Sequence, residues 1–177
     1  MQRKGTLLLD DGERATLIFQ RVYRHSPEHV WNAIATAEGL RGWLLCKHAR
    51  IEGRVGGRIE MVSGPAGYSS TGNILAWEPP RMLEYEWIVA PVPEMPRGEH
   101  AIFRYELTPD GESTHVLVTY RRVTKQTARG FLPGLHAFLD RLEAQLDGEV
   151  LPDWMHRFGE LRAEYPEWSG HASDPGE

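Results

Sequence analysis

The chain has 177 residues, a length typical of one domain and sufficient to bury a sizeable core. Its 25 acidic residues outnumber its 20 basic ones, the formal net charge is −5, and no run of five like charges occurs. Nucleic-acid grooves and anionic membrane surfaces rely on clustered cations, so neither a nucleic acid nor a membrane is an expected partner.

The single cysteine, Cys46, cannot form an internal disulfide. This favours a reducing compartment and makes the cytoplasm the expected location. The apolar stretch at residues 7–9 is too short for a secretion signal, and no apolar run approaches the length of a membrane span.

A strand is predicted over residues 15–24, which are rich in β-branched and aromatic side chains. Phe19, Arg21 and Tyr23 fall on one alternating face of this strand. A charged group that faces an apolar interior must be paired or must await a ligand, so Arg21 is the leading functional charge. A β-bulge between these residues would instead turn it outward.

Helical structure is predicted next, because Ser26 is a suitable N-cap and Pro27 suits the first helical position. Gly39 is predicted to end this helix. Residues 40–44 are then expected to form a second short helical turn that carries Trp43.

Short strands separated by turns are predicted from residue 46 onward. Apolar and charged side chains alternate within them, as where Tyr85 and Trp87 alternate with Glu84 and Glu86, so one face is expected to be buried and the other wet. The predicted strands cover residues 46–52, 57–63, 68–78, 81–89, 100–108 and 113–123.

A long helix is predicted over residues 127–148, because leucines that include Leu135 and Leu139 recur there at helical spacing. His136 and Asp140 are four residues apart at the border of this stripe. A surface hydrogen bond between them is the preferred interpretation, and an acid/base pair facing a pocket is the alternative.

The last residues, 151–177, are predicted to be an extension of a single domain that covers residues 1–150. A short helix is expected over residues 154–165, followed by a polar, disordered end.

This order of elements predicts an α+β fold in which a curved antiparallel sheet of six to seven strands grips the long C-terminal helix. Bulky aromatic side chains on the concave side would line a space between sheet and helix. The expected ligand-pocket residues are Arg21, Trp43, Met61, Tyr85, Trp87, Phe103, Tyr105, Tyr120, Leu135, His136 and Leu139.

Several segments resemble the START-like (SRPBCC, Bet v-like) helix-grip proteins. These include FQRVYRHSPEHVWNAIATAEGLRGWL, GNILAWEPPRMLEYEW and GLHAFLDRLEAQLDG, within a stretch from about residue 15 to 148. Inside that superfamily the pattern is similar to the branch named for the activator of the heat-shock-protein ATPase. The resemblance implies a hydrophobic pocket between sheet and C-terminal helix. The tail after residue 148 lies outside the shared pattern and would either cap this pocket or form a partner surface. The resemblance does not single out an activity, because the fold serves lipid carriers, receptors, cyclases and chaperone partners.

Motifs for other chemistry are weak. The glycine-rich residues 53–58 lie between two predicted strands, which favours a hairpin turn over a phosphate-binding loop. Cys46 and His48 share a strand face but supply too few ligands for a metal site. No catalytic residue, cofactor or metal is therefore predicted.

The preferred hypothesis is a protein that binds a small hydrophobic or aromatic ligand without chemistry of its own. One alternative is a cyclase- or aromatase-like enzyme that polarises a polyketide-type substrate with His136, Tyr85, Tyr120 or Arg21.

A second alternative is a protein-interaction module like the chaperone activator. Exposed Trp154, Phe158 and Trp168 would anchor its partner, or would mediate a homodimer.

Overall fold

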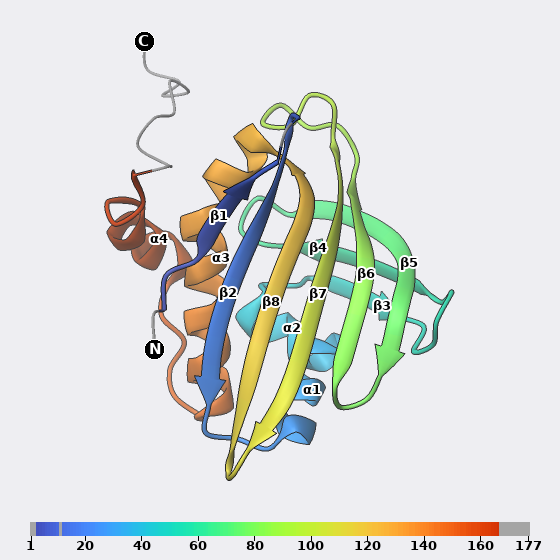
Figure 1. The fold of residues 1–177 in the computed structure, drawn as a ribbon, viewed down its shortest axis with the longest axis vertical. Helices are drawn as coiled ribbons and strands as arrows, with labels where there is room; N and C mark the ends of the chain where they lie inside the picture. Colours follow the sequence, from blue (N-terminus) through green and yellow to red (C-terminus); the bar gives the residue numbers. More distant parts are fainter. Residues whose placement is uncertain (1–2, 11, 167–177) are drawn as a thin grey trace.

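The computed structural model describes residues 3–10 and 12–166, which form a single eight-stranded antiparallel sheet and four helices (Figure 1). The helices are α1 (Pro27–Ile34), α2 (Ala37–Trp43), α3 (Lys125–Leu146) and α4 (Trp154–Arg162). The strands are β1 (Thr6–Leu9), β2 (Arg14–Tyr23), β3 (His48–Ile51), β4 (Arg58–Ser63), β5 (Tyr68–Glu78), β6 (Met82–Val89), β7 (Glu99–Asp110) and β8 (Ser113–Thr124).

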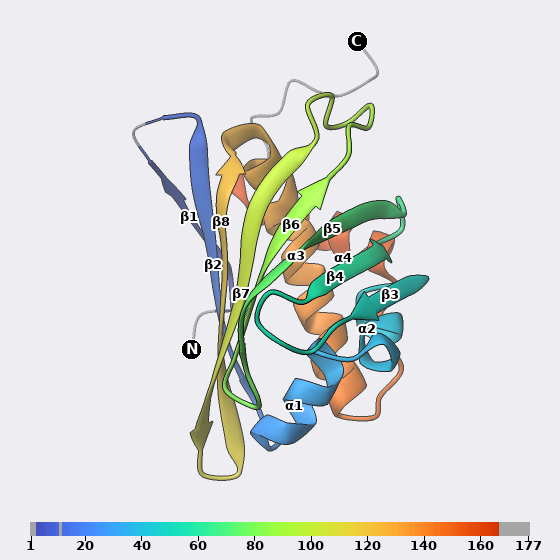
Figure 2. The ribbon, with the colours of Figure 1, turned by 90° about the vertical axis from the view of Figure 1, so that its right-hand side faces the viewer.

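Neighbouring strands follow the order β1-β2-β8-β7-β6-β5-β4-β3, and the sheet bends around α3 (Figure 2). Register shifts mark bulges in β2 between Ala15 and Leu17 and in β5 between Ile74 and Ala76. Bulges increase the local bend and twist of a sheet, which helps this sheet to curve. The predicted α+β helix-grip architecture is confirmed.

The sheet has one strand more than predicted. The additional strand is β1, in which Leu8 and Leu9 are both about half exposed. Its side chains do not alternate between a buried and a wet face, so the sequence lacks the signal by which the other strands were predicted.

Strand register gathers aromatic rings on the concave face. Tyr85 pairs with Phe103 across β6 and β7, and Phe103 pairs with Tyr120 across β7 and β8. All three side chains are buried. Side chains directly opposite one another on adjacent strands are close neighbours, so register makes these rings contiguous.

The convex face carries charged pairs instead. Glu84 on β6 accepts hydrogen bonds from Arg104 at 3.2 Å and from Arg121 at 2.7 Å. Arg104 lies on the adjacent strand β7, and Arg121 lies on β8, which pairs with β7. The two faces therefore differ in polarity as the alternation of the sequence predicts, but Glu84 itself is buried rather than wet, because the two arginines pack over it.

The N-terminus of α1 has the predicted cap: the Ser26 hydroxyl accepts a hydrogen bond from the backbone N–H of His29 at 3.2 Å.

The prediction that Gly39 ends this helix was wrong. The first helix ends at Ile34, and Gly39 lies inside α2. A Cβ on Gly39 would lie 2.3 Å from the carbonyl oxygen of Asn32, so a glycine is required for close contact between α1 and α2.

The C-terminal half of α3 is joined to α2 by side chains that bind backbone groups. Arg141, which is buried, donates to the carbonyls of Gly42 and Trp43, each at 3.0 Å. Gln145 accepts from the N–H of Trp43 at 2.8 Å and donates to the carbonyl of Gly39 at 2.9 Å. The Trp43 carbonyl is at the last residue of α2, where no further helical turn supplies a donor, and Arg141 provides one.

Within the described part of the chain, no helix combines the length and the apolar character needed to cross a membrane.

We expect Gly39→Ala to lower the free energy of unfolding by about 1–3 kcal/mol, because the added methyl group would overlap the backbone of α1. Gly159→Ala in α4 is the matched control, since no atom lies within 4 Å of the added carbon there. The control should gain up to about 1 kcal/mol from helix propensity. Urea-induced unfolding measures both, and an equal response of the two variants would contradict the packing role of Gly39.

Candidate functional site

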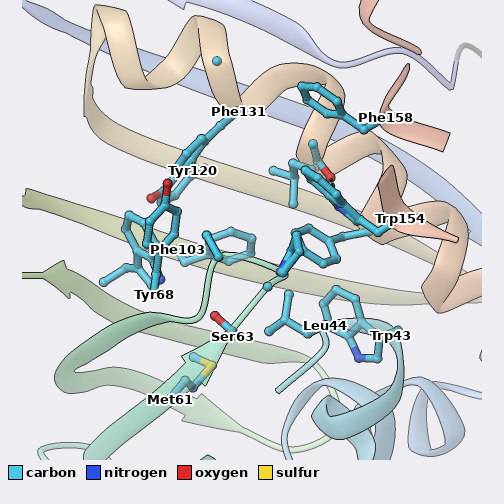
Figure 3. Close-up of a pocket in the computed structure, with 18 of the residues that line it drawn as sticks. Trp43, Leu44, Met61, Ser63, Tyr68, Phe103, Tyr120, Phe131, Trp154 and Phe158 are labelled. Atoms are coloured by element: carbon cyan, nitrogen blue, oxygen red, sulfur yellow. Dashed lines mark hydrogen bonds between the residues drawn. The ribbon is translucent and has the colours of Figure 1, made fainter. Parts of the chain in front are cut away.

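A cavity of about 530 Å³ lies between the concave face of the sheet, α3 and α4 (Figure 3). Cavities of about 300–1,000 Å³ are typical of sites for small molecules. Most of the residues expected to form a pocket do line it: Trp43, Met61, Tyr85, Trp87, Phe103, Tyr105, Tyr120 and Leu135.

One wall of the cavity is a continuous set of aromatic rings. The Phe103 ring stacks on Tyr85, with 5.9 Å between centroids and an interplanar angle of 10°. It also contacts Tyr120 at 5.0 Å, and Tyr120 stacks in turn on Phe131 of α3 at 6.2 Å. Such ring pairs stabilise by about 0.5–1.5 kcal/mol each beyond simple burial. The wall therefore presents mainly aromatic surface to the cavity.

The polar groups of the wall are tyrosine hydroxyls. Burial raises the pKa of Tyr85, Tyr105 and Tyr120, so all three remain protonated near neutral pH. The Tyr105 hydroxyl is hydrogen-bonded to that of Tyr85. The Tyr120 hydroxyl is buried and has no hydrogen-bond partner among the described residues. The site offers neutral hydroxyl groups, and none of the side chains that line it is charged.

The opposite wall comes from α3 and α4. On α3, Gly130 and Gly134 line the cavity next to larger apolar side chains. On α4 the lining residues are Trp154, Met155 and Phe158. The sequence left open whether the tail after residue 148 caps the pocket or forms a partner surface, and it named no residue of α4 as a lining residue. The one available signal was the spacing of the two glycines, which lie four residues apart and leave one helix face without side chains.

Three residues expected in the pocket, Arg21, His136 and Leu139, do not line it. Leu139 is fully buried in the core, and its carbonyl accepts a hydrogen bond from Tyr23 at 3.1 Å. His136 follows the pocket residue Leu135 directly, and one helical step of about 100° turns it to another side of α3. The sequence predicted apolar surroundings for all three residues. It did not distinguish residues that line the cavity from residues that are packed in the core.

Arg21 and His136 belong instead to a buried polar cluster centred on Asp140. The Asp140 carboxylate accepts from Arg3 at 2.8 Å and from Arg157 at 2.9 Å, and it lies 3.5 Å from Arg21. Arg21 also donates to the backbone carbonyl of Arg3. The sequence indicated a buried charge at Arg21 but could not identify these partners, which are distant along the chain.

Tyr165 links the cluster to both ends of the described chain. Its hydroxyl accepts from the N–H of Gly5 at 2.8 Å and lies 2.7 Å from Nδ1 of His136. Because the Tyr165 oxygen already accepts one bond, its own hydrogen is available for Nδ1. This places the imidazole proton on Nε2, which lies 3.5 Å from Asp140.

Electrostatics in the cluster keep His136 neutral. Burial lowers its pKa to about 4, and Arg21, Arg157 and Arg3 act in the same direction, whereas Asp140 opposes the shift. For Asp140 burial raises the pKa, but His136 and the arginines outweigh it and hold the value below its usual range. The cluster is thus a structural ion network that fastens Arg3 and Tyr165, near the two ends of the described residues, to α3.

Cys46 and His48 interact without forming a metal centre. The Cys46 thiol donates to the His48 carbonyl at 3.0 Å. Among residues 3–10 and 12–166, no three His, Cys, Asp or Glu side chains are grouped to hold a metal ion.

A bent antiparallel sheet closes on the long helix α3 around an apolar cavity. This arrangement defines the protein as a helix-grip domain. The sequence profile of the family described as Activator of Hsp90 ATPase homolog 1-like protein matches residues 24–147. The chain belongs to this family.

Solved structures support the same fold. CalU16 from Micromonospora echinospora is 20% identical, with a TM-score of 0.70 over 95% of this chain and 98% of its own. Protein MLL2253 from Mesorhizobium loti is 26% identical, with a TM-score of 0.65 over 77% of this chain and 99% of its own. A Bordetella parapertussis protein is 21% identical, with a TM-score of 0.66 over 93% and 94% of the two chains. A search of curated proteins gave no match.

Lowering the pH should destabilise the protein through His136. The unfolded chain protonates this residue near pH 6.5, whereas the folded protein does so near 4. Between these values the unfolded state binds more protons, so the free energy of unfolding falls as pH falls. We expect a loss of about 1.5 kcal/mol from pH 6.5 to pH 5 that His136→Gln removes. Urea unfolding at both pH values measures it, and an identical pH slope in the variant would refute the assignment.

Proposed function

We propose that the protein binds a small, neutral ligand with aromatic or other apolar surface in the cavity between sheet, α3 and α4. The observation that carries this proposal is the cavity of about 530 Å³, whose walls are apolar and aromatic. Its family and fold agree with a ligand-binding role.

The charge of the ligand follows from the lining. A carboxylate or ammonium group that entered the cavity would lose its hydration and find no side chain of opposite charge. A neutral polar group loses much less hydration in the same surroundings. The Tyr120 hydroxyl is buried and has no partner among the described residues, so a ligand would reach it only if neighbouring side chains moved.

The enzyme alternative has less support. Of its candidate groups, Tyr85 and Tyr120 lie in the cavity, whereas His136 and Arg21 belong to the cluster on another side of α3. The raised pKa values of the two tyrosines make them hydrogen-bond donors rather than bases at neutral pH. This favours binding without catalysis.

The protein-interaction alternative loses two of its proposed anchors, because Trp154 and Phe158 line the cavity. The third, Trp168, lies outside the described residues. Assembly as a homodimer stays a prediction.

Two fluorescent probes test the ligand class directly. N-Phenyl-1-naphthylamine and 8-anilinonaphthalene-1-sulfonate share one aromatic skeleton, and only the second carries a sulfonate. We expect the neutral probe to bind at a single site and at least about tenfold more tightly, because the anion has no counter-charge in the cavity. Fluorescence titration measures both dissociation constants. Tighter binding of the sulfonate would overturn the proposal.

A charge placed at the cavity edge should change this preference. Ser63 lines the cavity and is half-buried, so Ser63→Lys should tighten sulfonate binding about threefold to fivefold. Ser69→Lys is the matched control, because Ser69 is exposed and does not line the cavity. Equal affinities for the sulfonate in the two variants would show that it binds elsewhere.

A further inference from the structure

The helix α4 lies beyond the residues that match the family profile, which end at 147, yet it contributes side chains to the cavity. Trp154, Met155 and Phe158 occupy its first turn and the start of its second. Figure 3 shows Trp154 and Phe158 on the side of the cavity away from Phe131 and Tyr120. This wall is therefore an addition to the part of the fold that the family profile covers.

The surface of α3 is shaped to receive Trp154. A Cβ on Gly134 would lie 3.1 Å from the Trp154 ring and 3.9 Å from Phe158. The indole N–H of Trp154 donates to the Gly134 carbonyl at 3.2 Å, and the ring contacts Phe138, with 5.4 Å between centroids. It also stacks on Phe158 at 4.9 Å. Gly134 thus leaves the space in which the indole lies.

Both ends of α4 are anchored outside the cavity. Before the helix, Arg141 donates to the carbonyl of Pro152, and the Asp153 side chain caps the helix by accepting from His156 N–H at 2.9 Å. After it, Tyr165 is buried in the polar cluster around Asp140. Within the helix, Arg157 binds Asp140 at 2.9 Å. These contacts fix α4 without involving the side chains that line the cavity.

The exposed lining residues show where the cavity opens. They are Pro65 and Ala66 on the β4–β5 turn and Met155 on α4. Trp154 and Phe158 are only half-buried, whereas Met61 and Tyr105 on the sheet are buried. The mouth of the cavity therefore lies between the β4–β5 turn and α4, and the side chains of α4 form one of its two sides.

We infer that α4 selects and retains the ligand, with Trp154 as the residue that limits passage through the mouth of the cavity. This inference rests on the proposed function. A residue at the mouth restricts both entry and exit, whereas a buried wall residue contributes only to the stability of the bound state. Trp154 is consequently expected to affect both rate constants.

Stopped-flow fluorescence with N-phenyl-1-naphthylamine separates these roles. Trp154→Ala should raise the association rate constant at least about threefold and the dissociation rate constant about tenfold. Met61→Ala should raise only the dissociation rate constant. Trp154→Phe keeps a ring at the mouth and should restore an association rate close to that of the wild type. His156→Ala, on the exposed side of α4, is the matched control and should leave both rates within about twofold.

Thermal unfolding of each variant accompanies the kinetics, because a loss of folded protein lowers the binding amplitude without accelerating association. An unchanged association rate in Trp154→Ala would overturn the role of α4 while leaving the proposed function intact. Absence of probe binding by the wild-type protein would remove the proposed function and this inference together.

Discussion

The buried guanidinium of Arg141 binds three backbone carbonyls, those of Gly42, Trp43 and Pro152, and thereby joins α3 to α2 and to the segment that leads into α4. Hydrogen bonds from a charged donor contribute about 1.5–3 kcal/mol each, so this contact fixes the C-terminal half of α3 firmly. The N-terminal half of α3 contacts the sheet through Phe131, whose ring stacks on Tyr120 at 6.2 Å. The cavity lies there, beside Gly130 and Gly134.

The neighbouring residue, Asp140, makes the corresponding contacts on another side of α3. It holds Arg3 from the N-terminal segment and Arg157 from α4. The Asp140 carboxylate is mostly buried and binds both arginines at once, so the two contacts support one another. Two adjacent residues of α3 therefore position the elements around the cavity, while the cavity itself contains no charged side chain. Charged side chains thus position α2, α4 and the N-terminal segment on α3, whereas the cavity presents aromatic surface to a ligand.

The sequence predicted the sheet and the long helix because their alternation and leucine spacing are strong, local signals. It missed β1, whose exposed leucines do not alternate, and it misassigned Gly39, whose role depends on the distance between two helices. The aromatic wall was predictable from strand phase. The positions of Arg21 and Trp154 were not, because they depend on how distant segments dock on α3.

We expect a neutral aromatic molecule to occupy the space between the concave face and α3. A crystal structure of the complex with N-phenyl-1-naphthylamine tests it most directly. The complex should contain one probe molecule packed against Phe103 and Tyr120, covered by Leu135 and closed off by Trp154. A probe bound on the convex face or along β1, with the α3 side chains collapsed onto the sheet, would contradict it.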